Sequence, residues 1–225
     1  MKVSLIIPTF NEVSSIGQVL GQVPKNWIEE ILIIDAPSTD GTIELVKKLG
    51  YPIIFQENKG FGSAIITGIK YAKGDVLIFL TADNSQDPRD IPKLLEKIKE
   101  GYDLVLASRY LPGGKSEDDT FVTYIGNKFI TWLCNRIHRT KFTDSLYFFL
   151  AIRKKVLDSI KLNSPDFELC IELPIKVHKA GFKIAEIPSF ERKRKMGQRK
   201  VKRIYHGLRI ILKMFNLLCP SRFCF

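Results

Sequence analysis

The sequence of 225 residues lacks any apolar run of the roughly 18–20 residues that a helix needs to span a bilayer. It also leaves no room for a signal peptide, because its opening stretch, MKVSLIIPTF, is typical of a strand from the third residue onward. With neither feature, a cytosolic and reducing location is the default expectation.

Cysteine is scarce, and the four cysteines do not have the paired spacing of a metal site. Cys134 and Cys170 lie in apolar stretches with a helical pattern, where a free cysteine usually packs in the core. The other two, Cys219 and Cys224, lie beside PSRF in the last residues of the sequence. The cysteines therefore predict neither a metal centre nor a disulfide framework.

Two common nucleotide motifs are also missing. The sequence contains no G-x-x-x-x-G-K-[ST] phosphate loop, and no G-x-G-x-x-G follows the first predicted strand. The glycines at 59–64 open a predicted helix, so they suit either an anion at the helix N-terminus or a tight turn and close packing. These absences argue against ATP hydrolysis and dinucleotide redox chemistry.

Positive charge is in excess, with a formal net charge of +11 at pH 7. The excess is concentrated at 191–203, where most residues are Lys or Arg. Anionic partners are expected, namely phosphorylated substrates, an acidic membrane surface or nucleic acid. Nucleic acid is the weakest of the three, because no aromatic residues are interleaved with the charges.

Short apolar runs alternate with helical patterns along the chain. Strands are predicted at 3–10, 30–35, 52–57, 75–83 and 103–110, and helices at 12–23, 39–50, 60–74, 91–101, 121–138 and 168–181. The strands lack period-two alternation, which favours burial on both faces and hence a mostly parallel sheet sandwiched by helices. Two further strands of mixed direction are predicted at 148–154 and 183–191. The fold class is α/β.

Polar side chains follow several of these strands. They are Pro8, Thr9, Asn11 and Glu12 after the first strand, Asp35 at the end of the second, Asp83 at the end of the fourth, and Ser108 and Arg109 at the fifth. In an open parallel sheet, ligands bind at the carboxyl ends of the strands, so a binding crevice is expected there. Carboxylates facing a basic segment point to a divalent cation that bridges an aspartate and a diphosphate.

Several segments together resemble the family-2 glycosyltransferases. They are LIIPTFNE (5–12), ILIIDAPSTDGT (31–42), NKGFGSAIITGIKYAKGDVLIFLTAD (58–83), LASRYLPGG (106–114), TDSLYFFLAIRKKVL (143–157), FELCIELPIKVHKAGFKIAEIP (167–188) and MGQRK (196–200). Within that family the chain is most similar to the dolichyl- or polyprenyl-phosphate mannose and glucose synthases. The resemblance implies a GT-A fold and transfer of a sugar from a nucleotide-diphosphate donor with inversion.

The resemblance also implies roles for individual residues. Nucleotide-binding positions are Pro8, Thr9, Asn11, Glu12, Asp35, Lys59, Ala82 and Asp83. Asp83 matches the second acid of a D-x-D element that holds Mg²⁺ or Mn²⁺, and Thr81, Gln86 and Asp87 are further candidate ligands. Catalytic positions are Asp83, Arg109, Glu172, Arg194 and Lys200, where Arg194 and Lys200 match basic residues of a loop over the phosphates and Glu172 matches an acceptor-side acid.

The chain departs from the family pattern at two acids. Ala36 follows Asp35 where the family usually has a second acid, and Thr81 stands at the first position of the D-x-D element. Losing that charge should weaken metal binding, and Arg199 could take over part of the neutralisation of the diphosphate. A degenerate, non-catalytic homologue that binds a nucleotide sugar therefore remains an alternative.

The acceptor is left open by the sequence. A lipid phosphate is already an anionic nucleophile and needs no strong base, whereas a saccharide hydroxyl in surface-glycan assembly requires a carboxylate such as Glu172 or Glu168. A solvated helix face, or a pair with Lys176, is the structural alternative for these glutamates.

The C-terminal segment is predicted to be a basic amphipathic helix. Apolar residues recur at helical spacing in 200–218, with Lys and Arg around them. We expect it to cover the core, to contact the cytosolic face of a membrane, or both. The predicted division is a catalytic domain at 1–199, with a nucleotide-binding half at 1–110 and an acceptor half at 111–199, followed by the helix and tail at 200–225.

Overall fold

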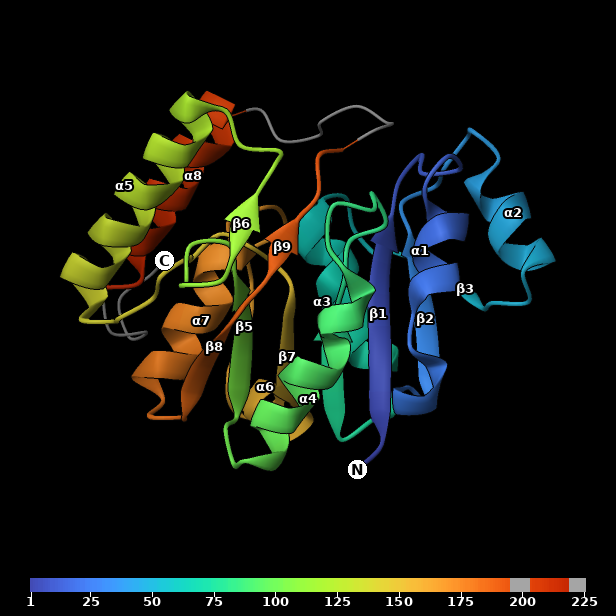
Figure 1. Ribbon diagram of the computed structural model, residues 1–225, viewed down its shortest axis with the longest axis horizontal. Coiled ribbons are helices and arrows are strands. Elements are labelled where there is room, and N and C mark those ends of the chain that lie inside the picture. The colour runs from blue at the N-terminus through green and yellow to red at the C-terminus, as the bar shows by residue number, and fades with distance from the viewer. Residues whose placement is uncertain (195–202, 219–225) are drawn as a thin grey trace.

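Seven strands form one central sheet in the order β3-β2-β1-β4-β7-β5-β8 (Figure 1). The computed structural model describes residues 1–194 and 203–218. The strands are β1 (Val3–Thr9), β2 (Glu30–Asp35), β3 (Ile53–Phe55), β4 (Val76–Phe79), β5 (Leu104–Ser108), β7 (Leu150–Arg153) and β8 (Ile184–Pro188). Only β7 runs antiparallel to its neighbours β4 and β5, so the sheet is mostly parallel as predicted.

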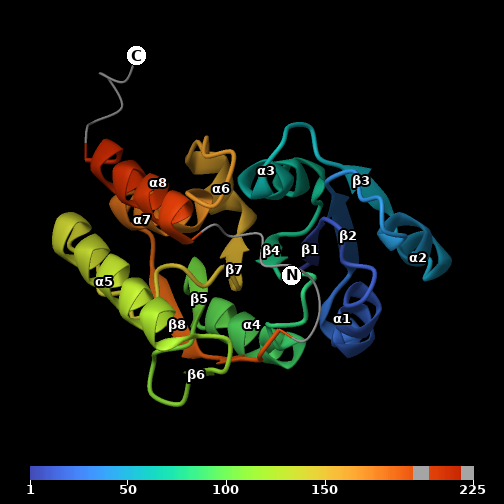
Figure 2. The ribbon, with the colours of Figure 1, turned by 90° about the horizontal axis from the view of Figure 1, so that it is seen from above.

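Helices cover both faces of the sheet (Figure 2). They are α1 (Ile16–Gln22), α2 (Thr42–Lys48), α3 (Phe61–Tyr71), α4 (Ile91–Lys99), α5 (Phe121–His138), α6 (Lys154–Ser159), α7 (Leu169–Lys179) and α8 (Arg203–Asn216). Short 3₁₀ turns lie at η1 (Lys25–Trp27) and η2 (Pro88–Asp90), and β6 (Lys115–Ser116) pairs with β9 (Phe190–Glu191) in a small second sheet.

The core consists of one apolar layer on each face of the sheet. In β4 the side chains of Leu77 and Phe79 pack with α3 and α7 on one face, and those of Val76 and Ile78 pack with α1 and α4 on the other. All four are fully buried, which explains why this strand has no polar alternation.

The fourth strand is shorter than the sequence predicts. Leu80 N–H still donates to the carbonyl of Ile6 at 3.1 Å, but Thr81 N–H donates to the side chain of Gln86 at 2.8 Å. The chain therefore leaves the sheet after Phe79, and Asp83 lies in a turn beyond the strand and not at its end. This turn, and not the ladder of the sheet, sets the direction of the Asp83 carboxylate.

Other boundaries differ in the same way. The helix predicted at 12–23 begins at Ile16, because the carbonyl of Glu12 first closes a turn with Ser15. Helix α6 was not predicted, since its six residues follow β7 directly within one apolar pattern. The predicted helix at 121–138 is confirmed in full.

Helix α8 packs beside α5 and α7 (Figures 1 and 2). Ile210 and Met214 face the core, and His206 is also buried. Within the described residues, no helix combines the length and the apolar character that crossing a bilayer requires.

Candidate active site

The carboxyl ends of β1 and β2 lie side by side because the two strands are parallel, with Thr9 opposite Asp35. The Thr9 hydroxyl donates to Asp35 Oδ2 at 2.7 Å, and Ser38 donates its backbone N–H to Oδ1 at 2.8 Å and its hydroxyl to Oδ2 at 2.7 Å. Asp35 is 1% exposed. The carboxylate therefore fixes the two loops that the sequence assigns to the nucleoside.

The loop after β1 is tied to the loop after β2 at two more points. Asn11 adopts a left-handed conformation with φ of 54°. Its N–H donates to the Ser38 hydroxyl, and its side-chain oxygen accepts from Thr39 N–H, both at 2.9 Å. Glu12 is buried and its N–H donates to the Thr42 hydroxyl at 2.8 Å. Pro8 lies in β1 next to Thr9 and is half-buried.

The glycine-rich stretch before α3 packs closely against another loop. A side chain at Gly60 or Gly62 would collide with backbone carbonyl oxygens between Ser164 and Asp166. Close packing, one of the two interpretations that the sequence leaves open, is therefore what the structure supports for these glycines. Lys59, just before them, is exposed.

The turn after β4 holds Asp83 through one of its two oxygens. Asp83 Oδ1 accepts hydrogen bonds from the Thr81 hydroxyl at 3.0 Å, from Ser85 N–H at 3.0 Å and from the Ser85 hydroxyl at 2.7 Å. Asp83 Oδ2 forms an ion pair with Arg194, from the segment after β9. Thr81 is thus a donor to Asp83 here, and Ala82 between them is buried.

The two other candidate metal ligands of this turn have protein partners. Gln86 accepts from Thr81 N–H and donates to the carbonyl of Phe148 at 3.3 Å. Asp87 forms ion pairs with Arg89 and Arg192, each at 2.7 Å. Burial acts to raise the pKa of Asp87, but the hydrogen bonds from Arg89 and the charge of Arg192 outweigh it and hold this pKa below its ordinary value.

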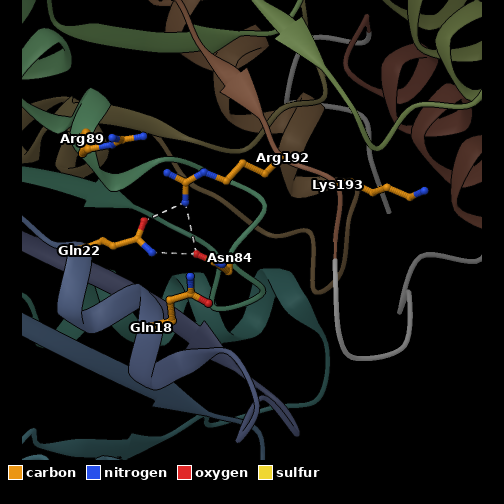
Figure 3. A pocket seen from close by; sticks show the side chains of 6 residues that line it. All are labelled: Gln18, Gln22, Asn84, Arg89, Arg192 and Lys193. Atoms are coloured by element: carbon orange, nitrogen blue, oxygen red, sulfur yellow. Dashed lines mark hydrogen bonds between the residues drawn. The ribbon is translucent and has the colours of Figure 1, made fainter.

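A polar cavity of about 370 Å³ lies beside this turn (Figure 3). Its lining residues come from α1, from the turn after β4, from η2 and from the segment after β9, and are Gln18, Gln22, Asn84, Arg89, Arg192 and Lys193. Arg192 points across it and donates to Gln22 at 2.8 Å and to Asn84 at 3.4 Å. The cavity is cationic and adjoins Asp83 through Asn84.

Arg109 is buried and paired with two carboxylates. Its guanidinium contacts Asp144 at 2.7 Å and Glu191 at 3.2 Å. Burial acts to lower the pKa of Arg109, but the two carboxylates outweigh it and hold this pKa well above its ordinary value. Arg109 also lines a second cavity of about 310 Å³ with Tyr110 and residues of α5. Its role at the phosphates stays a prediction, and its contacts are those of a group that fixes β5 to β9.

Glu172 lies on the opposite side of α7 from solvent, with no exposed surface. It accepts from Ser164 N–H at 2.8 Å and forms ion pairs with Lys176 at 2.6 Å and Lys213 of α8 at 3.2 Å. Burial acts to raise the pKa of Glu172, but these hydrogen bonds and charges outweigh it and lower the pKa. A base needs a raised pKa and a free oxygen, so the contacts do not favour that predicted role.

Glu168 resembles Glu172 in its attachment to α8, since one of its oxygens pairs with Arg209. The pair with Lys176 that the sequence offers as a structural alternative for Glu172 is present. Lys200 and Arg199, both predicted to act on the diphosphate, lie outside the described residues.

The residues present suit a divalent cation that is shared with a diphosphate. Within the described parts of the chain, no three His, Cys, Asp or Glu side chains are grouped closely enough to hold a metal ion by themselves. Asp83 Oδ2 is not held by the turn and pairs with Arg194 in this structure, and a carboxylate oxygen is a ligand that Mg²⁺ and Mn²⁺ prefer. The remaining ligands would have to come from phosphate oxygens and water.

Sequence reasoning missed the hydroxyl residues that hold the two aspartates. Ser38 follows Asp35 by three residues, and Ser85 follows Asp83 by two. Ser and Thr at such spacing often form side-chain turns, and this signal was available. Arg192 carried no such signal, because its contacts with Asp87 and Gln22 join segments far apart in the sequence.

The fold is that of GT-A glycosyltransferases. A crystal structure of glucosyl-3-phosphoglycerate synthase from Mycobacterium tuberculosis, in complex with Mn²⁺, UDP and phosphoglyceric acid, superposes with a TM-score of 0.79 at 18% identity. The superposition covers 96% of this chain and 78% of that one.

The chain belongs to glycosyl transferase family 2, whose family model matches residues 4–161. It is 35% identical to the dolichol-phosphate mannosyltransferase of Pyrococcus furiosus over 230 residues, covering 96% of this chain and 64% of that relative. It is 28% identical to an undecaprenyl-phosphate 4-deoxy-4-formamido-L-arabinose transferase of Klebsiella pneumoniae, covering 96% of this chain and 66% of that one. The chain therefore spans about two thirds of the length of these relatives.

Proposed function

We propose that this chain is an inverting glycosyltransferase that moves a sugar from a GDP- or UDP-linked donor to a polyprenyl or dolichyl phosphate. The observation that carries the proposal is the acidic turn after β4, where Asp83 is held by three hydrogen bonds through one oxygen and presents the other to Arg194. The two named relatives, which act on lipid phosphates according to their names, support the same substrate class.

The donor would lie along the carboxyl edge of β1, β2 and β4. The loops joined by Asp35 and Asn11 would hold the nucleoside, because their backbone is fixed by buried side-chain hydrogen bonds. Asp83 would hold Mg²⁺ or Mn²⁺ on the diphosphate, and the bound cation would stabilise the charge of the departing nucleoside diphosphate. Arg194 would add a guanidinium at the same place.

The acceptor is inferred from the state of Glu172 on α7. Glu172 is fully paired and its pKa is lowered, so it is poorly suited to take a proton from a sugar hydroxyl. The oxygen of a lipid phosphate carries its own negative charge and needs no such base for in-line attack at the anomeric carbon. A polyprenyl phosphate is therefore favoured over a saccharide acceptor.

Membrane contact is supported by the apolar side chains of two neighbouring helices. We call them the α5–α8 face, and its exposed large apolar residues are Phe121, Val122, Tyr124, Ile125, Phe129, Trp132, Ile204, Tyr205, Leu208, Leu212, Phe215 and Leu218. Phe121 is 80% exposed and Ile204 82%. Single exposed apolar residues are ordinary, but so many on two adjacent helices mark an interaction surface.

A lipid surface is the occupant that fits the substrate and the charge. The net charge of +11 attracts an anionic leaflet, and exposed Lys128 and Arg136 lie on α5 among the apolar residues. A membrane-bound acceptor phosphate would then approach from the side on which the α5–α8 face lies. We propose peripheral contact with the cytosolic face of a membrane, and the division into a domain at 1–199 and a helix and tail at 200–225 stays part of this proposal.

The proposal is tested by incubating the protein with a panel of GDP- and UDP-sugars, Mn²⁺ and either a polyprenyl phosphate or a saccharide acceptor. A glycolipid product that is lost in Asp83→Asn supports the proposal. The matched control is Asp75→Asn, because Asp75 is an acid that precedes β4 at the opposite end of the strand. Donor binding without transfer to either acceptor would instead support a non-catalytic nucleotide-sugar-binding protein.

A further inference from the structure

The two oxygens of Asp83 have partners of different kinds. Oδ1 is held by Thr81 and Ser85, which belong to the same turn. Among the described residues, Oδ2 pairs only with Arg194, which lies more than a hundred residues later in the sequence. The Asp83 side chain is 12% exposed and that of Arg194 is 22% exposed, so water screens this pair only in part. Oδ2 is therefore occupied by a cation that the chain itself supplies.

The contact with Asp83 leaves part of the hydrogen-bonding capacity of the Arg194 guanidinium unused. Its Nε is buried and has no hydrogen-bond partner among the described residues. Arg192, two positions earlier, contacts Asp87, Gln22 and Asn84 instead. A buried N–H without an acceptor is unfavourable, and an oxygen of a bound diphosphate would supply one. The arrangement of Arg194 is thus incomplete without an anion.

We propose that Arg194 takes the place of the divalent cation at Asp83 while no donor is bound, and exchanges with it when the donor arrives. This inference rests on the proposed function, in which Asp83 holds a cation on the diphosphate. In the exchange, Arg194 releases Oδ2 and donates to diphosphate oxygens, and the cation takes the freed carboxylate oxygen. No covalent bond changes.

Charge explains why the two cations compete. Asp83 carries one negative charge, and Thr81 contributes none where a second acid would have allowed both cations to stay. A guanidinium and a divalent ion at one carboxylate oxygen repel each other strongly in a partly buried site. The diphosphate brings the additional negative charge that lets both remain. Metal alone should therefore bind weakly, and metal with donor should bind well.

The test is a titration of the donor-free protein with Mn²⁺ alone. Electron paramagnetic resonance measures the concentration of free Mn²⁺ at each step, which gives the dissociation constant. Arg194→Gln should bind Mn²⁺ at least about tenfold more tightly than the wild type, because the competing charge is gone. Arg194→Lys keeps a positive charge and should stay within about threefold of the wild type. Arg192→Gln is the matched control, since it removes a neighbouring guanidinium that pairs with Asp87, and it should not tighten binding.

The inference is overturned if Arg194→Gln binds Mn²⁺ no more tightly than the wild type, or if Arg192→Gln tightens binding equally. The double variant Asp83→Asn with Arg194→Gln separates this failure from that of the proposed function. Loss of the tight binding in the double variant places the ion at Asp83. Persistence of tight Mn²⁺ binding in the double variant would contradict both the exchange and the proposed metal site. Glycolipid synthesis is measured in a separate assay, so it tests the proposed function independently of the Mn²⁺ titration.

Discussion

Thr81 is the residue at which this chain departs most clearly from the D-x-D pattern. Its hydroxyl donates to Asp83 Oδ1, so it orients the carboxylate and adds no negative charge. The turn therefore orients the Asp83 carboxylate but carries half of the negative charge of a D-x-D element. At the first position of the D-x-D element, Thr81 therefore orients Asp83 but does not supply a negative charge.

Thr81→Asp should restore the missing charge. We expect Mn²⁺ affinity of the donor-free protein to rise by about tenfold, because a second carboxylate would neutralise Arg194 and leave Asp83 Oδ2 for the ion. Thr81→Val removes the hydroxyl without adding charge and should not increase the affinity. Equal affinities of Thr81→Asp and the wild type, measured by the same titration, would show that charge at this position does not limit metal binding.

Glu172 is predicted to contribute to stability above pH 4.5. Its folded-state pKa is below the ordinary value of 4.5, so its contribution is complete above that value and is lost as the pH falls through the folded-state pKa. Glu172→Gln leaves Lys176 and Lys213 without their carboxylate and should cost about 2 kcal/mol in the free energy of unfolding at pH 7.

Chemical denaturation at pH 7 and at pH 3 measures this effect. The difference between the wild type and Glu172→Gln should shrink at the lower pH, where Glu172 becomes protonated. Glu100→Gln is the control, because Glu100 pairs with Lys97 on an exposed surface and should change stability by less than about 0.5 kcal/mol. A difference for Glu172→Gln that does not depend on pH would mean that its ion pairs do not stabilise the fold.

At the scale of elements, α3 begins where it does because two glycines allow another loop to approach. A Cβ at Gly62 would lie 2.9 Å from the Asp166 carbonyl oxygen and closer still to that of Ser164. Backbone carbonyls cannot move away cheaply, so the start of α3 and the loop before α7 are fixed to each other. The packing, and not helix propensity, requires glycine here.

Gly62→Ala should therefore destabilise the protein, by about 1–3 kcal/mol, although alanine favours helices. Gly126→Ala is the matched control inside α5, where a Cβ would meet no atom within 4 Å. This substitution should stabilise the protein by about 0.5–1 kcal/mol through helix propensity. Thermal unfolding of both variants gives the comparison, and a neutral Gly62→Ala would contradict the assigned packing.

The α5–α8 face yields a prediction for membrane binding. The double variant Trp132→Ser with Leu208→Ser removes one exposed apolar side chain from each helix, and it should reduce binding to vesicles of mixed anionic and neutral phospholipids by at least about tenfold. Co-sedimentation measures the bound fraction. Phe55→Ser, on β3 and 54% exposed, is the control and should bind like the wild type.

Two results would contradict this prediction. Unchanged binding by the double variant would mean that these helices do not contact the lipid. Equal binding to purely neutral vesicles would exclude the contribution assigned to positive charge.

Much of the sheet could be predicted because its strands are buried on both faces. The run at 75–83 identified β4, since an apolar run of that length bounded by polar residues suits a buried strand. Its end could not be predicted, because the strand stops where Gln86 captures Thr81 N–H, and hydropathy does not record such a contact. The strand β7 was found, but its place between β4 and β5 depends on long-range pairing.

The positions of the acidic residues in the site could be predicted from the sequence, but the partners of Arg109 and Glu172 could not. Asp35 and Asp83 follow parallel strands, so topology alone brings them to one edge. The partners of Arg109 and Glu172 come from segments distant in sequence, Asp144 and Glu191 for the first and Lys213 of α8 for the second. From the sequence alone, Arg109 could pair with a protein carboxylate or with a ligand phosphate, and Glu172 with a lysine or with a substrate. Only the fold distinguishes these possibilities.

At the scale of the whole molecule, one continuous sheet joins the two predicted halves. Strands β7 and β8 come from 111–199 and lie beside β4 and β5 from 1–110, so neither half has a complete sheet. The acidic edge after β1, β2 and β4 would hold a water-soluble donor, and the α5–α8 face would meet a lipid-bound acceptor. Under the proposed function, substrates from two phases would meet at Asp83.

The most direct measurement is the isolation of a glycolipid made by the purified protein from a nucleotide-diphosphate sugar, a polyprenyl phosphate and Mn²⁺. Its mass should equal that of the polyprenyl phosphate plus one sugar, and nuclear magnetic resonance should show the anomeric configuration inverted relative to the donor. The product should be absent with Asp83→Asn and present with Asp75→Asn. Failure to form it with every GDP- and UDP-sugar tested, or a product with retained configuration, would contradict the proposed function.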